Sequence, residues 1–290
     1  MKKHYLWMIA VALVVLTACS KQVFEDETMQ YDDSQQRLVR FDVQGDFETV
    51  DFTRGSLTAD GKSMTDLWVL DYMDGTLVAQ LHQVSTDEDF GTPQMALDFG
   101  EHHLYFVASR GKTPTLSTSE HTISWVTTSD TFWKDMSLEI TTGSAASQSV
   151  VLQRVATKMT VNINDEVPEG MTAIEITPES WFYGLNYMTG TAVHEMTSEP
   201  RIINIPSTYI GTKGEVSASI YGISSTTEWT TDVSVVAKDS DDDIIGQAVI
   251  RNAPFKANRV TTYSGDLFSS ESTFSITTDD QWETEHNGTW

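Results

Sequence analysis

The sequence predicts an all-β protein with two β-sandwich domains in tandem. Short segments in which apolar and polar residues alternate recur about every 8 to 15 residues, with polar turns between them. Threonine and serine are abundant, and no long segment repeats its apolar residues with the helical period of about 3.6. These observations favour sheets packed face to face over a helical bundle or a parallel α/β fold.

Residues 1–18 have the pattern of an export signal. Two lysines precede the apolar run Leu6–Val15. This run is too short to cross a ~30 Å hydrocarbon core as a helix, and it fits the central region of a signal peptide. The next residues, Leu16-Thr17-Ala18-Cys19, resemble the lipobox of bacterial lipoprotein precursors. Cys19 is the single cysteine, so the chain has no disulfide framework, and we predict that its sulfur carries the lipid.

The charge of the chain limits its partners. The formal net charge is −24, and loss of the two signal-peptide lysines makes the mature chain more acidic still. Such a surface repels nucleic acid and anionic lipid headgroups, so we expect no nucleic-acid partner. Contact with the outer membrane is expected through the acyl chains on Cys19. Residues 19–37 carry Glu25-Asp26-Glu27 and Asp32-Asp33, which indicates a flexible, acylated tether.

The first predicted domain covers residues 38–148. Alternation begins at Val39–Val43 and continues in part at Phe47–Phe52. The predicted strands Asp66–Tyr72 and Leu77–Leu81 flank Asp74-Gly75, a dipeptide typical of a two-residue hairpin turn. Further strands of this domain are expected at 103–108 and 137–140.

The second predicted domain covers residues 149–290. The small, polar stretch Gly143–Ser149 is expected to be the hinge that divides the chain. After it, strands are expected at 150–152, 158–163, 173–177, 201–205, 216–221, 232–237 and 244–250.

The sequence carries no motif that we recognise for catalysis, a metal or another cofactor. His194-Glu195 begins a zinc-protease pattern, but Ser198 stands where the second histidine is required. His102 and His103 are neighbours in a strand, so they point to opposite faces and do not easily share an ion. Asp239–Asp243 has the first spacings of a calcium loop without its glycine and closing glutamate, and is typical of a charged hairpin turn. We therefore predict a protein that is not an enzyme and needs no cofactor.

The aromatic residues leave two interpretations open. Trp125, Trp133 and the run Trp181-Phe182-Tyr183 are the densest examples. Such residues usually fill the space between the sheets of a sandwich. If they are exposed, they form a platform for sugars, and the protein is a surface glycan-binding lipoprotein. We keep this as the alternative function.

Three further segments resemble the fimbrillin superfamily, in particular its fimbrial subunits and fimbrial-anchor lipoproteins. Met64–Val78 is similar to an early strand and hairpin of the first domain of that family. Val151–Met159 is similar to its Leu-x-Arg-x-x-x-Lys strand, and Phe255–Phe268 to its Asn-Arg-x-Thr-x-x-x-Gly-x-Leu-Phe strand pair. Together with Cys19, these segments span nearly the whole chain in the expected order.

The resemblance implies two transthyretin-like Greek-key β-sandwiches and a structural or adhesive role in a fimbrium at the outer membrane. It also implies assembly by strand addition, in which a strand of one subunit fills an open groove of its neighbour. Other fimbrial subunits are therefore the expected partners. A ligand on a host or bacterial surface, and the position at base, stalk or tip, stay open.

In polymerising members of that family, an Arg-specific protease removes the N-terminal strand after export. Arg54-Gly55 is the matching site in this sequence, and an ordinary turn arginine is the other interpretation. Without cleavage the protein would keep its lipid, as an anchor does. The segment Ser272–Trp290 is either the donor strand or the last strand of the second sandwich, and it carries Phe274, Ile276, Trp282 and Trp290 between polar residues.

Overall fold

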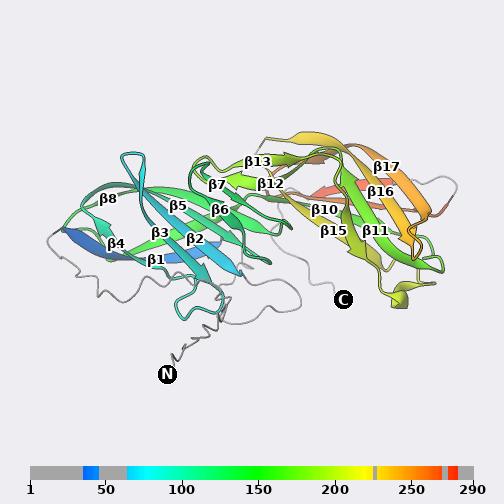
Figure 1. The fold of residues 1–290 in the computed structure, drawn as a ribbon, viewed down its shortest axis with the longest axis horizontal. Helices are drawn as coiled ribbons and strands as arrows, with labels where there is room; N and C mark the ends of the chain where they lie inside the picture. The colour runs from blue at the N-terminus through cyan, green and yellow to red at the C-terminus, as the bar shows by residue number, and fades with distance from the viewer. Residues whose placement is uncertain (1–34, 46–63, 225–226, 270–273, 280–290) are drawn as a thin grey trace, which may run out of the picture.

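The computed structural model describes residues 35–45, 64–224, 227–269 and 274–279 (Figure 1). These residues form strands and one 3₁₀ turn, Ser207–Tyr209, and contain no α-helix. The prediction of an all-β protein is therefore confirmed. A helix long and apolar enough to cross a membrane is also absent from the described ranges.

The N-terminal strands form one seven-stranded sheet that folds over into a sandwich. The strand order is β3-β2-β5-β8-β9-β1-β4. Side chains from β1, β4 and β9 share one core with side chains from β2, β5 and β8, so the two ends of the sheet pack on each other. The ring of Phe41 in β1 meets that of Phe106 in β5 edge-on, with centroids 5.3 Å apart. The strands are β1 (Gln36–Gly45), β2 (Asp66–Met73), β3 (Thr76–Val84), β4 (Gln94–Asp98), β5 (Gly100–Ser109), β8 (Thr131–Ile140) and β9 (Ser147–Arg154).

The hairpin between β2 and β3 is the one that the sequence predicts. Asp74 and Gly75 have φ angles of 49° and 75°, which a two-residue turn of type I′ requires at both central positions. Met73 and Thr76 face each other across the turn. The Asp-Gly dipeptide therefore sets the pairing next to the turn, and the register shifts once further along, between Asp71 and Tyr72.

The C-terminal strands form a second sandwich from two four-stranded sheets. Their orders are β15-β10-β18-β19 and β14-β11-β16-β17. Alternate residues of both sheets fill the core, and Trp181 also packs in it. The strands are β10 (Ala156–Ile163), β11 (Met171–Pro178), β14 (Arg201–Asn204), β15 (Val216–Ile223), β16 (Trp229–Asp239), β17 (Ile244–Phe255), β18 (Val260–Gly265) and β19 (Phe274–Asp279).

A fourth sheet of short strands, the junction sheet, joins the two halves of the chain. Its order is β13-β12-β7-β6, so strands from residues 115–124 pair with strands from residues 181–196. Leu185 lies opposite Ile123 in the ladder between β12 and β7. In Figure 1 this sheet lies between the two sandwiches. The strands are β6 (Thr115–Ser117), β7 (Thr122–Ser124), β12 (Trp181–Asn186) and β13 (Thr191–Met196).

Two side-chain contacts also join the halves. The hydroxyls of Tyr72 in β2 and Tyr187 after β12 lie 2.7 Å apart. The guanidinium of Arg154 at the end of β9 donates to both carboxylate oxygens of Asp130, at 2.8 and 3.2 Å, and to Asn258 Oδ1 at 3.2 Å. Asn258 lies in the turn between β17 and β18, so Arg154 connects the first sandwich to the second.

The domain boundary that we predicted between residues 148 and 149 stays a prediction. The strand pairing is relevant to where such a boundary lies. Both residues lie inside β9, and Val150 and Leu152 of that strand pack in the N-terminal core. The stretch predicted as a hinge, Gly143–Ser149, connects β8 and β9, which are neighbours in one sheet. The change from one sheet to the next comes after Arg154, where β9 ends.

Candidate functional site

β1 is the best candidate for a removable strand. It lies between β4, with which it runs antiparallel, and β9, with which it runs parallel. The side chains of Val39, Phe41 and Val43 point into the core and are 0%, 0% and 6% exposed. Arg40 and Asp42 point the other way and pair with each other at the surface. β1 therefore has the alternation of a strand that seals one face of a core.

Loss of β1 would open a slot between β4 and β9. Each buried apolar side chain of this size contributes about 1.5–3 kcal/mol, so the three together contribute about 5–9 kcal/mol. That amount is comparable to the whole stability of a typical domain, about 5–15 kcal/mol. The slot would also expose unpaired backbone groups on two strand edges. An open slot of this kind favours refilling by another extended strand.

Five of the predicted site residues lie outside the described part of the chain. They are Cys19, Arg54, Gly55, Trp282 and Trp290. In the sequence, Arg54 stands between the end of β1 at Gly45 and the first core residue after it, Met64. A cut after Arg54 would therefore separate β1 covalently from the rest of its sandwich.

The predicted donor residues Phe274 and Ile276 lie in β19. This strand pairs with β18, with Phe274 opposite Gly265 and Ile276 opposite Tyr263. Phe274 is half-buried against the second core, whereas Ile276 is 51% exposed. Within the segment Ser272–Trp290, the described residues 274–279 form a strand of the second sandwich. Its service as a donor stays a prediction.

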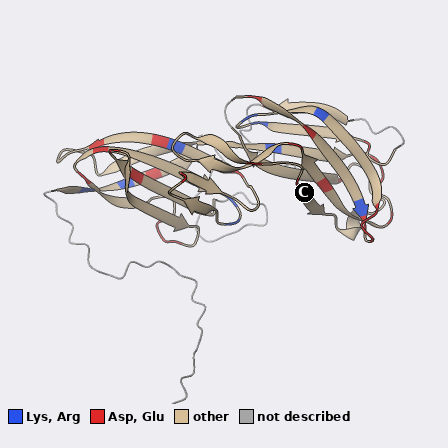
Figure 2. Cartoon of the chain, turned by 45° about the horizontal axis from the view of Figure 1, so that its top comes forward, with Lys and Arg blue, Asp and Glu red and all other residues tan. Residues whose placement is uncertain are grey.

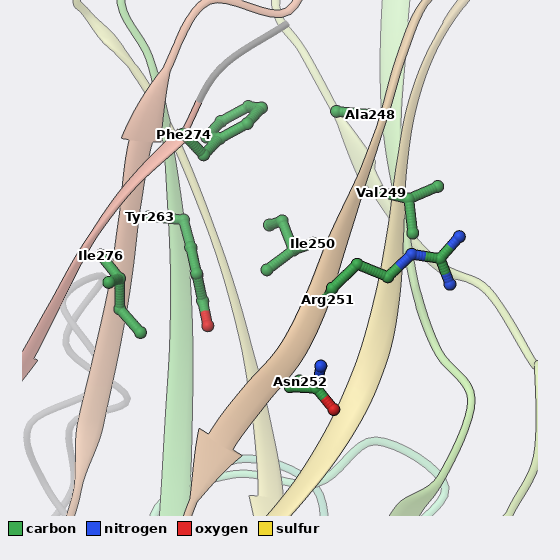
Figure 3. Close-up of a pocket in the computed structure, with 8 residues that line it drawn as sticks. All are labelled: Ala248, Val249, Ile250, Arg251, Asn252, Tyr263, Phe274 and Ile276. Carbon is green, nitrogen blue, oxygen red and sulfur yellow. The ribbon is translucent and has the colours of Figure 1, made fainter.

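A groove of about 350 Å³ opens between β17 and β19. β17 and β19 are each the last strand of their sheet, so two sheet edges border the groove. The Tyr263 hydroxyl is buried there and makes no hydrogen bond within the described residues, and burial raises the pKa of Tyr263 to about 12. Figure 3 shows the lining residues, which are Ala248, Val249, Ile250, Arg251, Asn252, Tyr263, Phe274 and Ile276.

Two of the three tryptophans considered for a sugar platform are buried. Trp125 and Trp181 are each 2% exposed. Their indole N–H groups donate to Ser109 Oγ at 3.3 Å and to the carbonyl oxygen of Tyr221 at 2.9 Å. No aromatic side chain in the described ranges ranks among the exposed large hydrophobic residues. An exposed platform built on Trp125 or Trp181 is therefore wrong, because both indoles fill cores.

The histidine pair lies as the strand period predicts. His102 is buried, with Nδ1 2.8 Å from Asp71 Oδ1 and Nε2 2.8 Å from the carbonyl oxygen of Asp98. His103 points to the opposite face, where its ring meets Ser137. Burial raises the pKa of Asp71, and the bond to His102 opposes that rise. The sequence did not reveal the His102–Asp71 pair, because the two residues are brought together by strand register.

The acidic run and the partial zinc motif both make local contacts within the second half of the chain. Asp239 Oδ1 accepts the backbone N–H groups of Asp241 and Asp243 at 2.9 and 3.0 Å, which closes the hairpin turn between β16 and β17. His194 stacks on Tyr183. The described residues contain no group of three or more His, Cys, Asp or Glu arranged to hold a metal ion. Figure 2 shows the charged positions scattered over both sandwiches, with no continuous basic face in view.

Comparison with solved structures gives several matches. A Bacteroides ovatus protein described as a candidate adhesin is 12% identical, with a TM-score of 0.51, and the match covers 76% of this chain and 84% of that one. The tip fimbrial protein Mfa3 from Porphyromonas gingivalis is 13% identical, with a TM-score of 0.43 and coverage of 84% and 98%. The fimbrial anchor protein Mfa2 from the same organism is 10% identical, with a TM-score of 0.46 and coverage of 84% and 98%. The match to the Bacteroides ovatus protein shows a shared fold.

Sequence comparison gives a family. A search of curated protein sequences finds no significant match. A family model described as "Family of unknown function (DUF6562)" matches residues 101–290, from β5 to the end of the sequence. This match covers more than half of the chain, and it shows that the protein belongs to the DUF6562 family.

Proposed function

We propose that this protein is a non-enzymatic subunit or anchor of a bacterial surface fimbrium, with a structural or adhesive role. In this proposal it is exported as a lipoprotein, lipidated at Cys19 and held at the outer membrane by its acyl chains. Its partners are other fimbrial subunits, joined by strand exchange. The lipobox, the three segments that resemble fimbrillins and the fold shared with the Bacteroides ovatus candidate adhesin support the proposal.

The observation that carries the proposal is the position of β1. This strand supplies three buried side chains to the N-terminal core and pairs on both of its edges. The segment after it contains Arg54, the one arginine between Gly45 and Met64. A single cut there would free β1 and leave a slot whose shape and backbone edges suit another extended strand.

A donor for that slot needs apolar side chains at alternate positions. In β19, Phe274 and Ile276 stand two residues apart, and both line the groove side of the strand. β19 is a strand at the end of its sheet and is mostly exposed, so its exchange from one subunit to the next uncovers little core. We therefore propose β19 and the residues after it, with Trp282 and Trp290, as the donor segment.

The fate of the lipid separates two forms of the proposal. If Arg54 is cut, the part of the chain that carries Cys19 leaves with β1, and the subunit that starts at Gly55 joins a polymer. If Arg54 is not cut, the chain keeps both β1 and its lipid and serves as an anchor. The two products differ at their N-terminus, so mass alone distinguishes them.

The test is intact-mass analysis of protein from surface fimbriae, with the wild type, Arg54→Ala and Lys62→Ala compared. Lys62 lies in the same segment, so its replacement is a matched control for the loss of one positive charge. For a polymerised subunit, we expect a mass that starts at Gly55 in the wild type and Lys62→Ala, and an acylated mass that starts at Cys19 in Arg54→Ala. An acylated mass in all three, at the base of fimbriae, supports the anchor form. Absence of the protein from fimbriae in all three contradicts the proposal.

A further inference from the structure

Two tyrosine hydroxyls and one histidine nitrogen form a closed triangle beside the junction sheet. The hydroxyls of Tyr72 and Tyr187 lie 2.7 Å apart, and His121 Nδ1 lies 3.2 Å from the first and 3.3 Å from the second. We call these three groups the junction triangle. The two tyrosines are buried, whereas His121 is partly exposed, so a proton from solvent has access to the imidazole ring.

The junction triangle ties three separate segments together. Tyr72 belongs to β2 of the N-terminal sandwich. His121 lies in the turn between β6 and β7 with a φ of 57°, and its carbonyl oxygen accepts the backbone N–H of Tyr187 at 3.0 Å. Tyr187 follows β12, and its carbonyl oxygen accepts the indole N–H of Trp133 at 2.7 Å. The triangle therefore joins the first sandwich to two turns of the junction sheet.

The number of hydrogens in the triangle determines where the imidazole carries its proton. The two hydroxyls make no further hydrogen bond within the described residues. One hydroxyl can donate to the other, and the second can donate to Nδ1 only if that nitrogen is unprotonated. Both hydroxyl hydrogens are then satisfied. The closed triangle thus requires a neutral His121 with its ring proton on Nε2.

A protonated His121 does not fit the closed triangle. An imidazolium carries hydrogens on both nitrogens, so Nδ1 becomes a donor. Only one hydroxyl hydrogen can lie between the two oxygens, and the other then points at no acceptor, which is costly for a buried hydroxyl. Burial, followed by the bond to Tyr72, raises the pKa of Tyr187 above its ordinary value, so no phenolate forms to accept the extra hydrogen.

Other titratable groups near the triangle do not replace the missing acceptor. Tyr105 of β5 packs its ring against both tyrosines, and burial, followed by the charge of Asp135, raises its pKa. Glu120 precedes His121 and is exposed. His103 lies opposite Tyr72 in the β2–β5 ladder and pairs with a serine hydroxyl. None of these groups hydrogen-bonds to the triangle within the described residues.

We propose that His121 is a proton-sensitive latch between the N-terminal sandwich and the junction sheet, closed when its Nδ1 is unprotonated and opened when Nδ1 takes up a proton. The open form binds one proton more than the closed form, so falling pH favours opening. Histidine changes its charge between about pH 5 and 8, so the triangle holds at the upper end of this range and weakens toward the lower end. This inference concerns contacts within one chain and does not rest on the proposed fimbrial role.

Hydrogen exchange of the full chain tests the latch, with the wild type and His121→Asn compared. The asparagine Oδ1 can accept a hydrogen bond and does not titrate, and asparagine tolerates the positive φ at this position. Protection of the Tyr187 backbone N–H and the Trp133 indole N–H is measured at about pH 7.5 and about pH 5, after correction for the pH dependence of chemical exchange. Between these values we expect a loss of at least about tenfold in the wild type and less than about twofold in His121→Asn.

Two results of this comparison overturn the proposal. The first is an equal loss of protection in the two proteins, or no loss in the wild type. The second is an equal loss at the backbone N–H of Val235, in the core of the second sandwich, because the whole chain would then be unfolding in acid.

Nitrogen-15 NMR of the His121 ring is a second test and needs only the wild type. We expect a protonated Nε2 and an unprotonated Nδ1 at about pH 7.5. As the pH falls, protonation of Nδ1 and loss of protection at the Tyr187 backbone N–H should have the same midpoint. A proton on Nδ1 at the higher pH, or a protonated Nδ1 beside a Tyr187 N–H that stays protected, overturns the proposal.

Discussion

The Tyr72 hydroxyl of the first sandwich lies 2.7 Å from the hydroxyl of Tyr187, which lies between β12 and β13 of the junction sheet. The two residues are 2% and 0% exposed, and His121 Nδ1 lies within 3.3 Å of both hydroxyls. A buried bond of this kind contributes about 0.5–1.5 kcal/mol net. It also holds the end of β12 against β2, and so it helps to join the two halves of the chain.

A double-mutant cycle measures this bond. We expect Tyr72→Phe and Tyr187→Phe each to lower the free energy of unfolding by about 1 kcal/mol, and the double substitution to cost clearly less than the sum. Denaturant unfolding of the four proteins gives the coupling. Strict additivity would mean that the two hydroxyls act independently.

Phe41 is expected to be the main anchor of β1. Its ring is fully buried and meets Phe106, so Phe41→Ala should lower the free energy of unfolding by about 3–5 kcal/mol. Leu38, in the same strand, is 45% exposed and serves as the control. Leu38→Ala should change stability by less than about 1 kcal/mol. Denaturant unfolding monitored by circular dichroism checks both values, and equal losses would contradict the described face of β1.

His102 and His103 provide a second matched pair. His102→Ala leaves the Asp71 carboxylate buried without its partner, and we expect a loss of about 3–5 kcal/mol in the free energy of unfolding. His103→Ala removes a side chain on the exposed face and should change stability by less than about 0.5 kcal/mol. Thermal unfolding of the two variants at neutral pH makes the comparison. A small effect at His102 would show that Asp71 is solvated or protonated in the folded chain.

Tyr263 is expected to make stability fall at high pH. Burial raises its pKa to about 12, whereas tyrosine in an unfolded chain titrates near 10. Between these values the folded state keeps a proton that the unfolded state loses, so rising pH favours unfolding. The contribution is fully present below pH ~10 and is lost by pH ~12, with a size on the order of 2–3 kcal/mol. Tyr263→Phe should flatten the decline in unfolding free energy over this window, which denaturant unfolding at a series of pH values measures, and an unchanged decline would contradict the role of Tyr263.

Gly222 is expected to be required by the packing of Trp181. A Cβ atom at residue 222 would lie 2.6 Å from Trp181 Cε2, closer than side chains tolerate. Gly222→Ala should therefore cost about 1–3 kcal/mol through displacement of the indole. At residue 143 a Cβ atom would lie 3.9 Å from its nearest neighbour, Thr141 Oγ1, so Gly143→Ala is the control. Near-ultraviolet circular dichroism reports the indole, and an unchanged spectrum with unchanged stability would contradict the close contact.

The strands that the sequence predicted are those with their own local signal. β2 and β3 enclose Asp74-Gly75, so their type and their turn follow from neighbouring residues, whereas the register shift between Asp71 and Tyr72 does not. β10 and β16 also carry alternation over most of their length. In such segments the period of the side chains and the turn chemistry agree, and tertiary contacts only reinforce them.

The junction sheet could not be predicted in this way. β6 and β7 have three residues each, which is too short for a period to be read. β7 pairs with β12 about sixty residues away, and only the folded chain sets that register. The candidate site shows the same limit: Phe274 and Ile276 were recognised by their alternation, whereas the groove and Tyr263 depend on how two sheets end side by side.

The junction sheet has a mechanical consequence. The sandwiches lie end to end in Figure 1, so tension applied at the two ends of the molecule must pass through the region between them. There the covalent connection after Arg154 is accompanied by the β7–β12 ladder, the Tyr72–Tyr187 bond and the Arg154–Asn258 bond. These links act in parallel, so extension at this point requires several of them to rupture together. The molecule should therefore behave as a stiff rod under tension, and its two halves should not separate before these links rupture.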